Sequence, residues 1–169
     1  LKLQLRYENM LQKLILCLKN INNVNIIFKL HPQQNIHNDI MKSVIKKLDS
    51  KIIVLQDESI KEILDDAYLL INISTDNLDV STVIFESMLI NVPIINLKLQ
   101  KNNWEYDIEK NGAVISCNYD SDYENEILNL INNKTEYVKQ ISEIKKFLEF
   151  YLKNKQNASE ELIRLINKQ

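Results

Sequence analysis

Two hydroxyl groups and one carboxylate stand close together in the segment STVIFESMLINVPIIN, residues 81–96. Ser81 and Thr82 precede an apolar stretch of helical character that keeps a single acid, Glu86. Free backbone N–H groups and the dipole at a helix N-terminus favour an anion. Thr82 and Glu86 share one helix face, so a phosphate at the first turn would place an attached ribose near Glu86, whose carboxylate accepts hydrogen bonds. Alternatively, Ser81 is a simple N-cap and Glu86 a solvated acid.

A second candidate, His31, ends the apolar run NIIFKLHP, residues 25–32. Pro32 favours an extended backbone at His31, and Lys29, two residues earlier, lies on the same face of the predicted strand. An imidazole beside a leaving diphosphate could donate a hydrogen bond or a proton as negative charge develops. The alternative is a histidine that only bonds to nearby backbone.

The composition excludes several kinds of site. Gly112 is the single glycine, so a Gly-rich phosphate loop is excluded. The chain has 21 basic and 23 acidic residues, a balance that disfavours a nucleic-acid binder. Cys17 and Cys117 show no metal-ligand spacing, so we expect buried free thiols, no metal site and a reducing, cytoplasmic location. We also expect neither a signal peptide nor a transmembrane segment.

Two hydrophobic periodicities alternate along the chain and predict its fold. Short apolar runs predict strands over residues 25–31, 51–55, 68–74, 93–97 and 113–117. Helical spacing predicts helices between them, over residues 38–49, 59–67 and 81–91, and elsewhere through stripes such as Leu11, Leu14, Ile15 and Leu18. Ser59 and Glu62 stand in capping-box register. The alternation predicts an α/β, Rossmann-like fold: one domain over residues 1–169 with a parallel sheet and helices on both faces.

The order of four segments resembles the C-terminal, donor-nucleotide-binding domain of GT-B glycosyltransferases. Residues 81–96 look like their donor-site motif, a Ser/Thr pair followed by Glu and then by Pro before an apolar strand. IIFKLHP (26–32) looks like a signature of CDP-glycerol glycerophosphotransferases, capsule-polymer transferases and the UDP-N-acetylglucosamine 2-epimerase family. Residues 59–74 and 154–166 match the segments that those families place between and after these motifs.

The resemblance implies roles for individual residues. It implies that His31 is catalytic and that the nucleotide and its phosphates are bound by a set of five residues: Lys29, Gln56, Ser81, Thr82 and Glu86. Ligands of parallel sheets bind beyond the carboxyl ends of the strands, so we expect these residues to converge on one cleft. Asn91 stands where these families have glycine, and we expect it to end the helix in a left-handed conformation. Trp104 and Tyr106 could stack on a base, or simply pack on the fold.

The implied activity is transfer of a sugar or polyol phosphate from a UDP- or CDP-linked donor in the synthesis of a surface polysaccharide or glycoconjugate. The donor would be the substrate, and no other cofactor is expected. An N-terminal acceptor-binding domain of the same protein would be the partner and is expected to be missing from this chain, which alone should catalyse little. The full protein could associate peripherally with a membrane. Two alternatives stay open: a non-hydrolysing UDP-N-acetylglucosamine 2-epimerase-like domain, and a non-catalytic, flavodoxin-like binding module.

Overall fold

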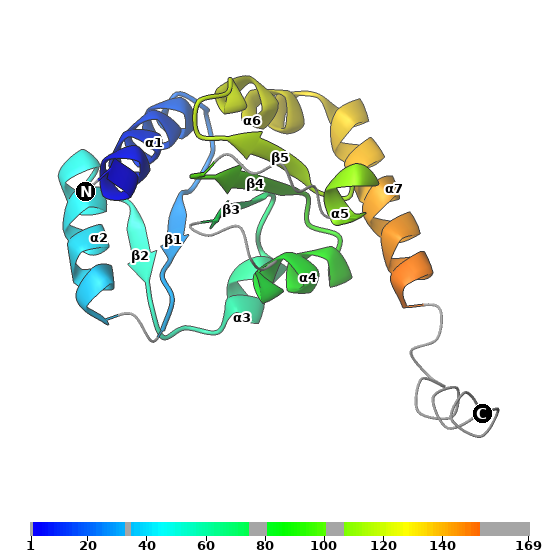
Figure 1. The fold of residues 1–169 in the computed structure, drawn as a ribbon, viewed down its shortest axis with the longest axis horizontal. Coiled ribbons are helices and arrows are strands. Elements are labelled where there is room, and N and C mark those ends of the chain that lie inside the picture. The colour runs from blue at the N-terminus through cyan, green and yellow to red at the C-terminus, as the bar shows by residue number, and fades with distance from the viewer. Residues whose placement is uncertain (1, 33–34, 75–80, 101–106, 153–169) are drawn as a thin grey trace.

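A computed structural model of the chain describes residues 2–32, 35–74, 81–100 and 107–152 (Figure 1). Trp104, Tyr106 and the predicted C-terminal segment 154–166 lie outside these ranges. The elements follow in the order α1 (Lys2–Lys19), β1 (Ile27–Lys29), α2 (Asn35–Leu48), β2 (Ile53–Leu55), α3 (Ile60–Asp65), β3 (Leu70–Ser74), α4 (Thr82–Leu89), β4 (Ile94–Lys98), α5 (Asp107–Lys110), β5 (Ile115–Asn118), α6 (Tyr123–Asn132) and α7 (Lys134–Tyr151).

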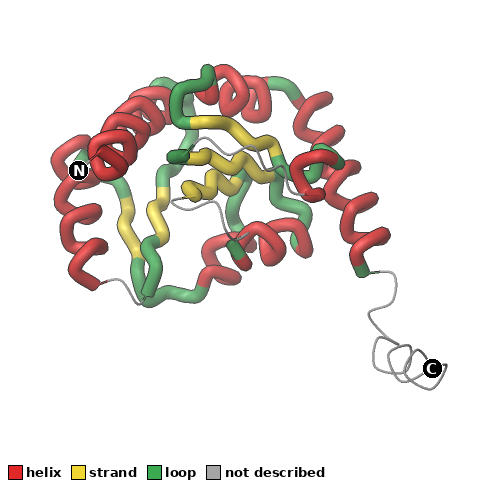
Figure 2. Tube along the Cα trace, in the orientation of Figure 1, coloured by secondary structure: helices red, strands yellow, loops and turns green. Residues whose placement is uncertain are grey.

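Every strand pairing in the described part of the chain is parallel, which confirms the predicted α/β fold. β1 pairs with β2, and β4 lies between β3 and β5. The prediction of one sheet differs from the structure, in which the described strands form two sheets surrounded by helices (Figure 2). β1 and β2 are only three residues long, so they offer few backbone groups for further pairing. Side chains join the sheets instead, because Phe28 of β1 and Ile73 of β3 pack in the same apolar cluster.

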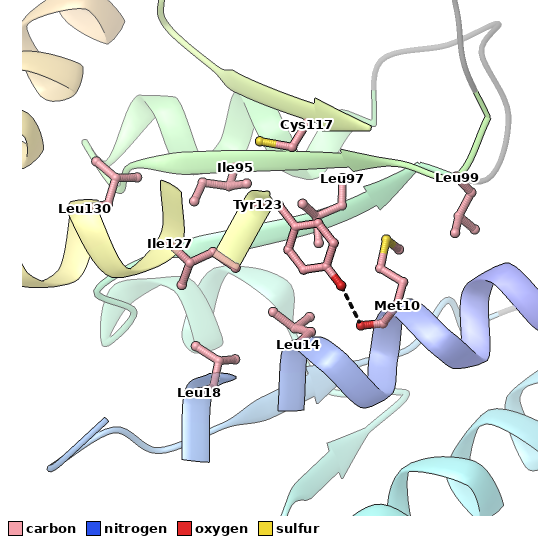
Figure 3. Packing of buried hydrophobic residues seen from close by; sticks show 10 residues of the cluster. All are labelled: Met10, Leu14, Leu18, Ile95, Leu97, Leu99, Cys117, Tyr123, Ile127 and Leu130. Carbon is pink, nitrogen blue, oxygen red and sulfur yellow. Dashed lines mark hydrogen bonds between the residues drawn. The ribbon is translucent and has the colours of Figure 1, made fainter. Parts of the chain in front are cut away.

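Helices α1 and α6 cover one face of the three-stranded sheet. Their apolar side chains pack on Ile95 and Leu97 of β4 (Figure 3). Tyr123 of α6 is fully buried there, and its hydroxyl donates a hydrogen bond to the carbonyl oxygen of Met10 at 3.2 Å. The predicted stripe of α1 is divided between this cluster and the one beneath β1 and β2: Leu14 and Leu18 in the first, Leu11 and Ile15 in the second.

Helices α4, α5 and α7 cover the opposite face of that sheet, so helices on both faces are confirmed. Their buried side chains pack on the amino-terminal ends of the strands, in a cluster of Ile84, Met88, Ile94, Ile108, Ala113, Val114, Ile144 and Phe147. Across residues 2–32, 35–74, 81–100 and 107–152, no helix is long and apolar enough to span a membrane.

Two local predictions need correction. Ser59 is the N-cap residue of α3, but its side chain makes no capping hydrogen bond, so the capping box with Glu62 is wrong. Its carbonyl oxygen accepts from the Ile63 N–H at 3.3 Å instead, and this backbone bond starts the helix. Cys117 is a buried free thiol as expected, whereas Cys17 is only half-buried.

Candidate functional site

Helix α4 carries three of the residues that the sequence singled out. Ser81 holds the N-cap position with φ −57° and ψ 132°, and its side chain makes no capping hydrogen bond. Thr82 is exposed, and Glu86 is half-buried one turn later. The first N–H groups of a helix have no intrahelical acceptor, and the Ser81 hydroxyl does not take one of them. Ser81 is thus the N-cap residue by position, as that alternative has it, but its hydroxyl is not used to cap the helix.

The packing of α4 directs its N-terminus toward the carboxyl ends of the strands. Ile84 and Met88 are buried against the sheet, which leaves Thr82 and Glu86 on the other sides of the helix. The segment after α4 returns to the amino-terminal end of the sheet, where the Leu70 N–H donates to the carbonyl oxygen of Pro93 at 2.9 Å. The start of α4 therefore faces the edge at which parallel sheets bind ligands.

Asn91 ends α4 in the left-handed conformation that we expected, with φ 59°. The Val92 N–H donates to the carbonyl oxygen of Ser87, and the Asn91 N–H donates to that of Met88, both at 3.0 Å. These two bonds form a Schellman motif, which usually needs glycine at the left-handed position. The buried Ser87 hydroxyl also donates to the carbonyl oxygen of Val92 at 3.2 Å. The turn into β4 is therefore built with asparagine in the place of glycine.

Lys29 and Gln56 meet at the carboxyl ends of β1 and β2. The Lys29 ammonium donates to the carbonyl oxygens of Leu30 at 3.0 Å and Gln56 at 2.5 Å. Lys42 donates to the Gln56 side-chain oxygen at 2.9 Å, and the Gln56 N–H donates to the Glu58 carboxylate at 2.8 Å. The backbone of Gln56, one of the residues that the resemblance implies to bind the nucleotide, thus already bonds to Lys29 and Glu58 within the chain.

His31 lies directly beyond the last paired residue of β1, as predicted. The Leu30 N–H donates to the carbonyl oxygen of Leu55 at 2.8 Å, which extends the pairing one residue past the strand. His31 itself is exposed, and its carbonyl oxygen accepts from the Asn38 side chain at 2.5 Å. Hydrogen bonds from the backbone N–H groups of Glu58 itself, Gln56 and Asp57, together with the charge of Lys29, lower the pKa of the Glu58 carboxyl, which follows β2.

The structure therefore brings the predicted residues together as two groups. Lys29 and Gln56 are in contact, and His31 follows β1 at the same end. Ser81, Thr82 and Glu86 share the start of α4. The convergence of both groups on one cleft stays a prediction.

The three-stranded sheet holds a further set of polar residues that our sequence analysis missed. At the amino-terminal end of the strands, the face toward α4 is apolar. Toward the carboxyl ends, the same face turns polar on all three strands, because polar residues alternate there with apolar ones. In register, Asn72 pairs with Asn96 and Asn96 with Ser116; next along, Ser74 pairs with Lys98 and Lys98 with Asn118.

Asn72, Ser74 and Asn96 form one hydrogen-bonded network across β3 and β4. The oxygen of the Asn96 side chain accepts from the Asn72 amide and from the Ser74 hydroxyl, both at 2.7 Å. The Asn72 amide also reaches the Ser74 hydroxyl at 3.3 Å. Asn96 is 6 % exposed, and its amide nitrogen makes no hydrogen bond within the described ranges.

Lys98, Glu109 and Ser116 form an adjoining network between β4, α5 and β5. The Lys98 ammonium lies 2.7 Å from each Glu109 carboxylate oxygen, and the Ser116 hydroxyl donates to the same carboxylate. The turn at Gly112 explains why Glu109 lies beside β5. With φ 71° it ends the short helix α5, its N–H donating to the Glu109 carbonyl oxygen at 2.9 Å. The chain then turns directly into β5, which carries Ser116.

A sequence signal for these residues exists. The strands read LINIS, IINLK and ISCN, each with polar residues at alternate positions in its second half. A parallel sheet with both faces covered normally shows near-continuous apolar strands, so this recurrent alternation marks a polar half-face. The apolar positions between them, such as Ile73 and Leu97, face α1 and α6.

Among the residues that the structure describes, those on the opposite face offer no comparable chemistry. Burial, with the nearby charge of Glu126, raises the pKa of the Cys117 thiol to about 11, so the thiol stays neutral and unreactive near neutral pH. Arg6 of α1 lies over the Tyr119 ring at 4.3 Å and donates to the carbonyl oxygen of Leu99 at 3.5 Å, which fastens α1 to the ends of β4 and β5. Over the ranges that the structure describes, no cluster of three His, Cys, Asp or Glu residues could hold a metal ion.

Comparison with known proteins gives no match: no family model, no curated protein and no solved structure is significantly similar to this chain.

Proposed function

We propose that this chain binds the nucleotide-activated donor of a GT-B glycosyltransferase that transfers a sugar or a polyol phosphate. One observation carries the proposal: the start of α4, where the Ser81 hydroxyl does not cap the helix, faces the carboxyl ends of a parallel sheet whose face turns polar on all three strands. Nucleotides bind parallel sheets at that edge, and a helix N-terminus favours their phosphates.

In this proposal the start of α4 binds the diphosphate. The first-turn N–H groups and the hydroxyls of Ser81 and Thr82 donate hydrogen bonds to its oxygens. Glu86, half-buried on the same helix, accepts from two ribose hydroxyls. His31 is the catalytic candidate, and it stabilises the leaving diphosphate by donating a hydrogen bond or a proton. Lys29 and Gln56 fix the end of β1 against that of β2, which positions the backbone at His31.

Calorimetric titration of UDP and CDP into the 169-residue chain tests the proposal. We expect one of them to bind saturably, and we expect Ser81→Ala/Thr82→Ala to weaken that binding about tenfold or more, because charge-assisted hydrogen bonds contribute about 1.5–3 kcal/mol each. Ser142→Ala is the matched control, since this exposed serine lies on α7. Absence of saturable binding by either nucleotide would overturn the proposal. So would equal affinities of the double variant and the control.

A further inference from the structure

The polar half-face, formed by Asn72, Ser74, Asn96, Lys98, Ser116 and Asn118, is an unexpected feature of a covered parallel sheet. Burying polar groups is unfavourable unless they are hydrogen-bonded, and a site where a folding rule is broken is often a functional one. Leu70 and Ile94, on the same face at the other end of their strands, follow the rule and pack under α4. The exception is thus confined to the ends of the strands where ligands bind.

Lys98, the charged residue that the strands contribute to this half-face, is already paired with an acid. Its ammonium lies 2.7 Å from each carboxylate oxygen of Glu109. A phosphate would need an unneutralised cation or an open set of N–H donors, and its oxygens would be repelled by the Glu109 carboxylate. Phosphate recognition therefore fits the start of α4 better than it fits this half-face.

This half-face offers a ligand both a hydrogen-bond donor and a hydrogen-bond acceptor. The amide nitrogen of Asn96, a residue 6 % exposed, donates to nothing in the described ranges. The Asn72 amide is engaged through its nitrogen, which leaves its oxygen as an acceptor. A hydroxyl group can accept a hydrogen bond from the Asn96 nitrogen and donate one to the Asn72 oxygen, whereas a phosphate oxygen can only accept. The pair is therefore suited to a hydroxyl-rich, uncharged group.

We infer that Asn72 and Asn96, supported by Ser74 and by the Lys98–Glu109–Ser116 network, bind the neutral sugar or polyol part of the donor. This inference rests on the proposed function, because the nucleotide at α4 would deliver that group to the sheet. Lys98 and Glu109 are positioning residues, which keep β4, β5 and α5 together around the two asparagines.

The first test compares each nucleotide with its conjugate by titration: UDP with UDP-N-acetylglucosamine, and CDP with CDP-glycerol. We expect the wild-type chain to bind one conjugate about tenfold more tightly than the bare nucleotide, as one or two hydrogen bonds to hydroxyl groups can provide. Asn96→Asp keeps the oxygen that accepts from Asn72 and Ser74 but loses the free donor. It should abolish the preference and leave the affinity for the bare nucleotide within about twofold. Asn132→Asp, an exposed asparagine on α6, is the control for added charge.

A second measurement keeps the inference testable should Asn96→Asp fold poorly. The side-chain amide signals of Asn72 and Asn96 in the wild-type chain are followed by NMR during titration with free N-acetylglucosamine and with glycerol. Saturable shifts of both signals support the inference even if no nucleotide binds, in which case the proposed function alone fails. If a nucleotide binds but neither amide responds to its conjugate or to the free compounds, the proposed function stands and this inference is overturned.

Discussion

Lys98 and Glu109 form a buried ion pair between β4 and α5, with 2.7 Å from the ammonium to each carboxylate oxygen and side chains that are 10 % and 3 % exposed. Glu109 also accepts from the Ser116 hydroxyl of β5. One acid therefore links two strands and a helix at the end of the sheet where we propose that the donor binds.

Loss of one partner of this pair should destabilise the protein strongly. We expect Lys98→Met to lower the free energy of unfolding by about 3–5 kcal/mol, because it removes the buried ammonium that lies against the Glu109 carboxylate. The double variant Lys98→Met/Glu109→Leu should recover most of that loss, since it removes both charges. Urea denaturation measures both. Lys146→Met is the control, because its ion pair with Glu143 is exposed and should contribute at most about 1 kcal/mol. Equal losses of unfolding free energy for Lys98→Met and Lys146→Met would contradict a buried Lys98–Glu109 ion pair.

The protein should be more stable with glycine at position 91 than with alanine. Its φ of 59° is unfavourable for a side chain with a Cβ atom, and asparagine tolerates this conformation better than alanine does. We expect Asn91→Ala to destabilise the chain by about 1 kcal/mol and Asn91→Gly to be neutral or slightly stabilising. Thermal and urea unfolding of the three proteins decide the order. If alanine were the most stable of the three, the Schellman turn would not describe the protein in solution.

Glu86 offers a separate test of the ribose contact. Glu86→Gln keeps the size of the side chain but replaces one acceptor by a donor, so UDP or CDP binding should weaken by about 1.5–3 kcal/mol. Because Glu86 is only half-buried, its substitution should change the free energy of unfolding by less than about 0.5 kcal/mol. Calorimetry and melting curves are measured on the same samples. Unchanged nucleotide affinity with a large fall in melting temperature would make Glu86 a structural acid.

The Cys117 thiol should remain unreactive in the native protein until the solution is strongly alkaline. Burial raises its pKa from the ordinary value of 9.0 to about 11, and only the thiolate is nucleophilic. The raised pKa means that the folded state holds the proton more tightly, so the associated stability is complete below pH 9 and is lost as the pH rises toward 11. Iodoacetamide labelling followed by peptide mass spectrometry at pH 7.5, 9 and 10.5 tests the reactivity. Labelling in urea is the control, and rapid native labelling at pH 7.5 would contradict the buried position.

Local pattern was sufficient to predict the class of fold and the position of its strands. Each observed strand starts within two residues of its predicted start. Short apolar, β-branched runs such as that of β4 favour strands over helices. The left-handed Asn91 was predicted too, but from the resemblance, because it stands where those families have glycine at the end of a helix. In contrast, the separation of β1 and β2 from the other strands depends on which distant residues pair, and local periodicity holds no information about that.

The candidate site was only partly predictable for a related reason. Ser81, Thr82 and Glu86 lie close together in the sequence, so helical spacing alone groups them. Asn72, Asn96 and Ser116 are contributed by three strands, and they become neighbours only through the register of the sheet. Their shared alternation was present in the sequence, but each strand shows it over just two positions. Ser116 and Glu109 also depend on the turn at Gly112, which brings α5 back over β5.

The division into two sheets implies that the two sheets unfold locally with different free energies. β1 and β2 form an isolated pair of three-residue strands, and such pairs have little stability of their own, whereas all five residues of β4 are buried between two partners. Amide hydrogens of β1 and β2 should therefore exchange with solvent before those of β4. A ligand that reaches His31 and Gln56 would bind to the part of the protein that opens first. It would then slow exchange in β1 and β2 by a larger factor than in β4.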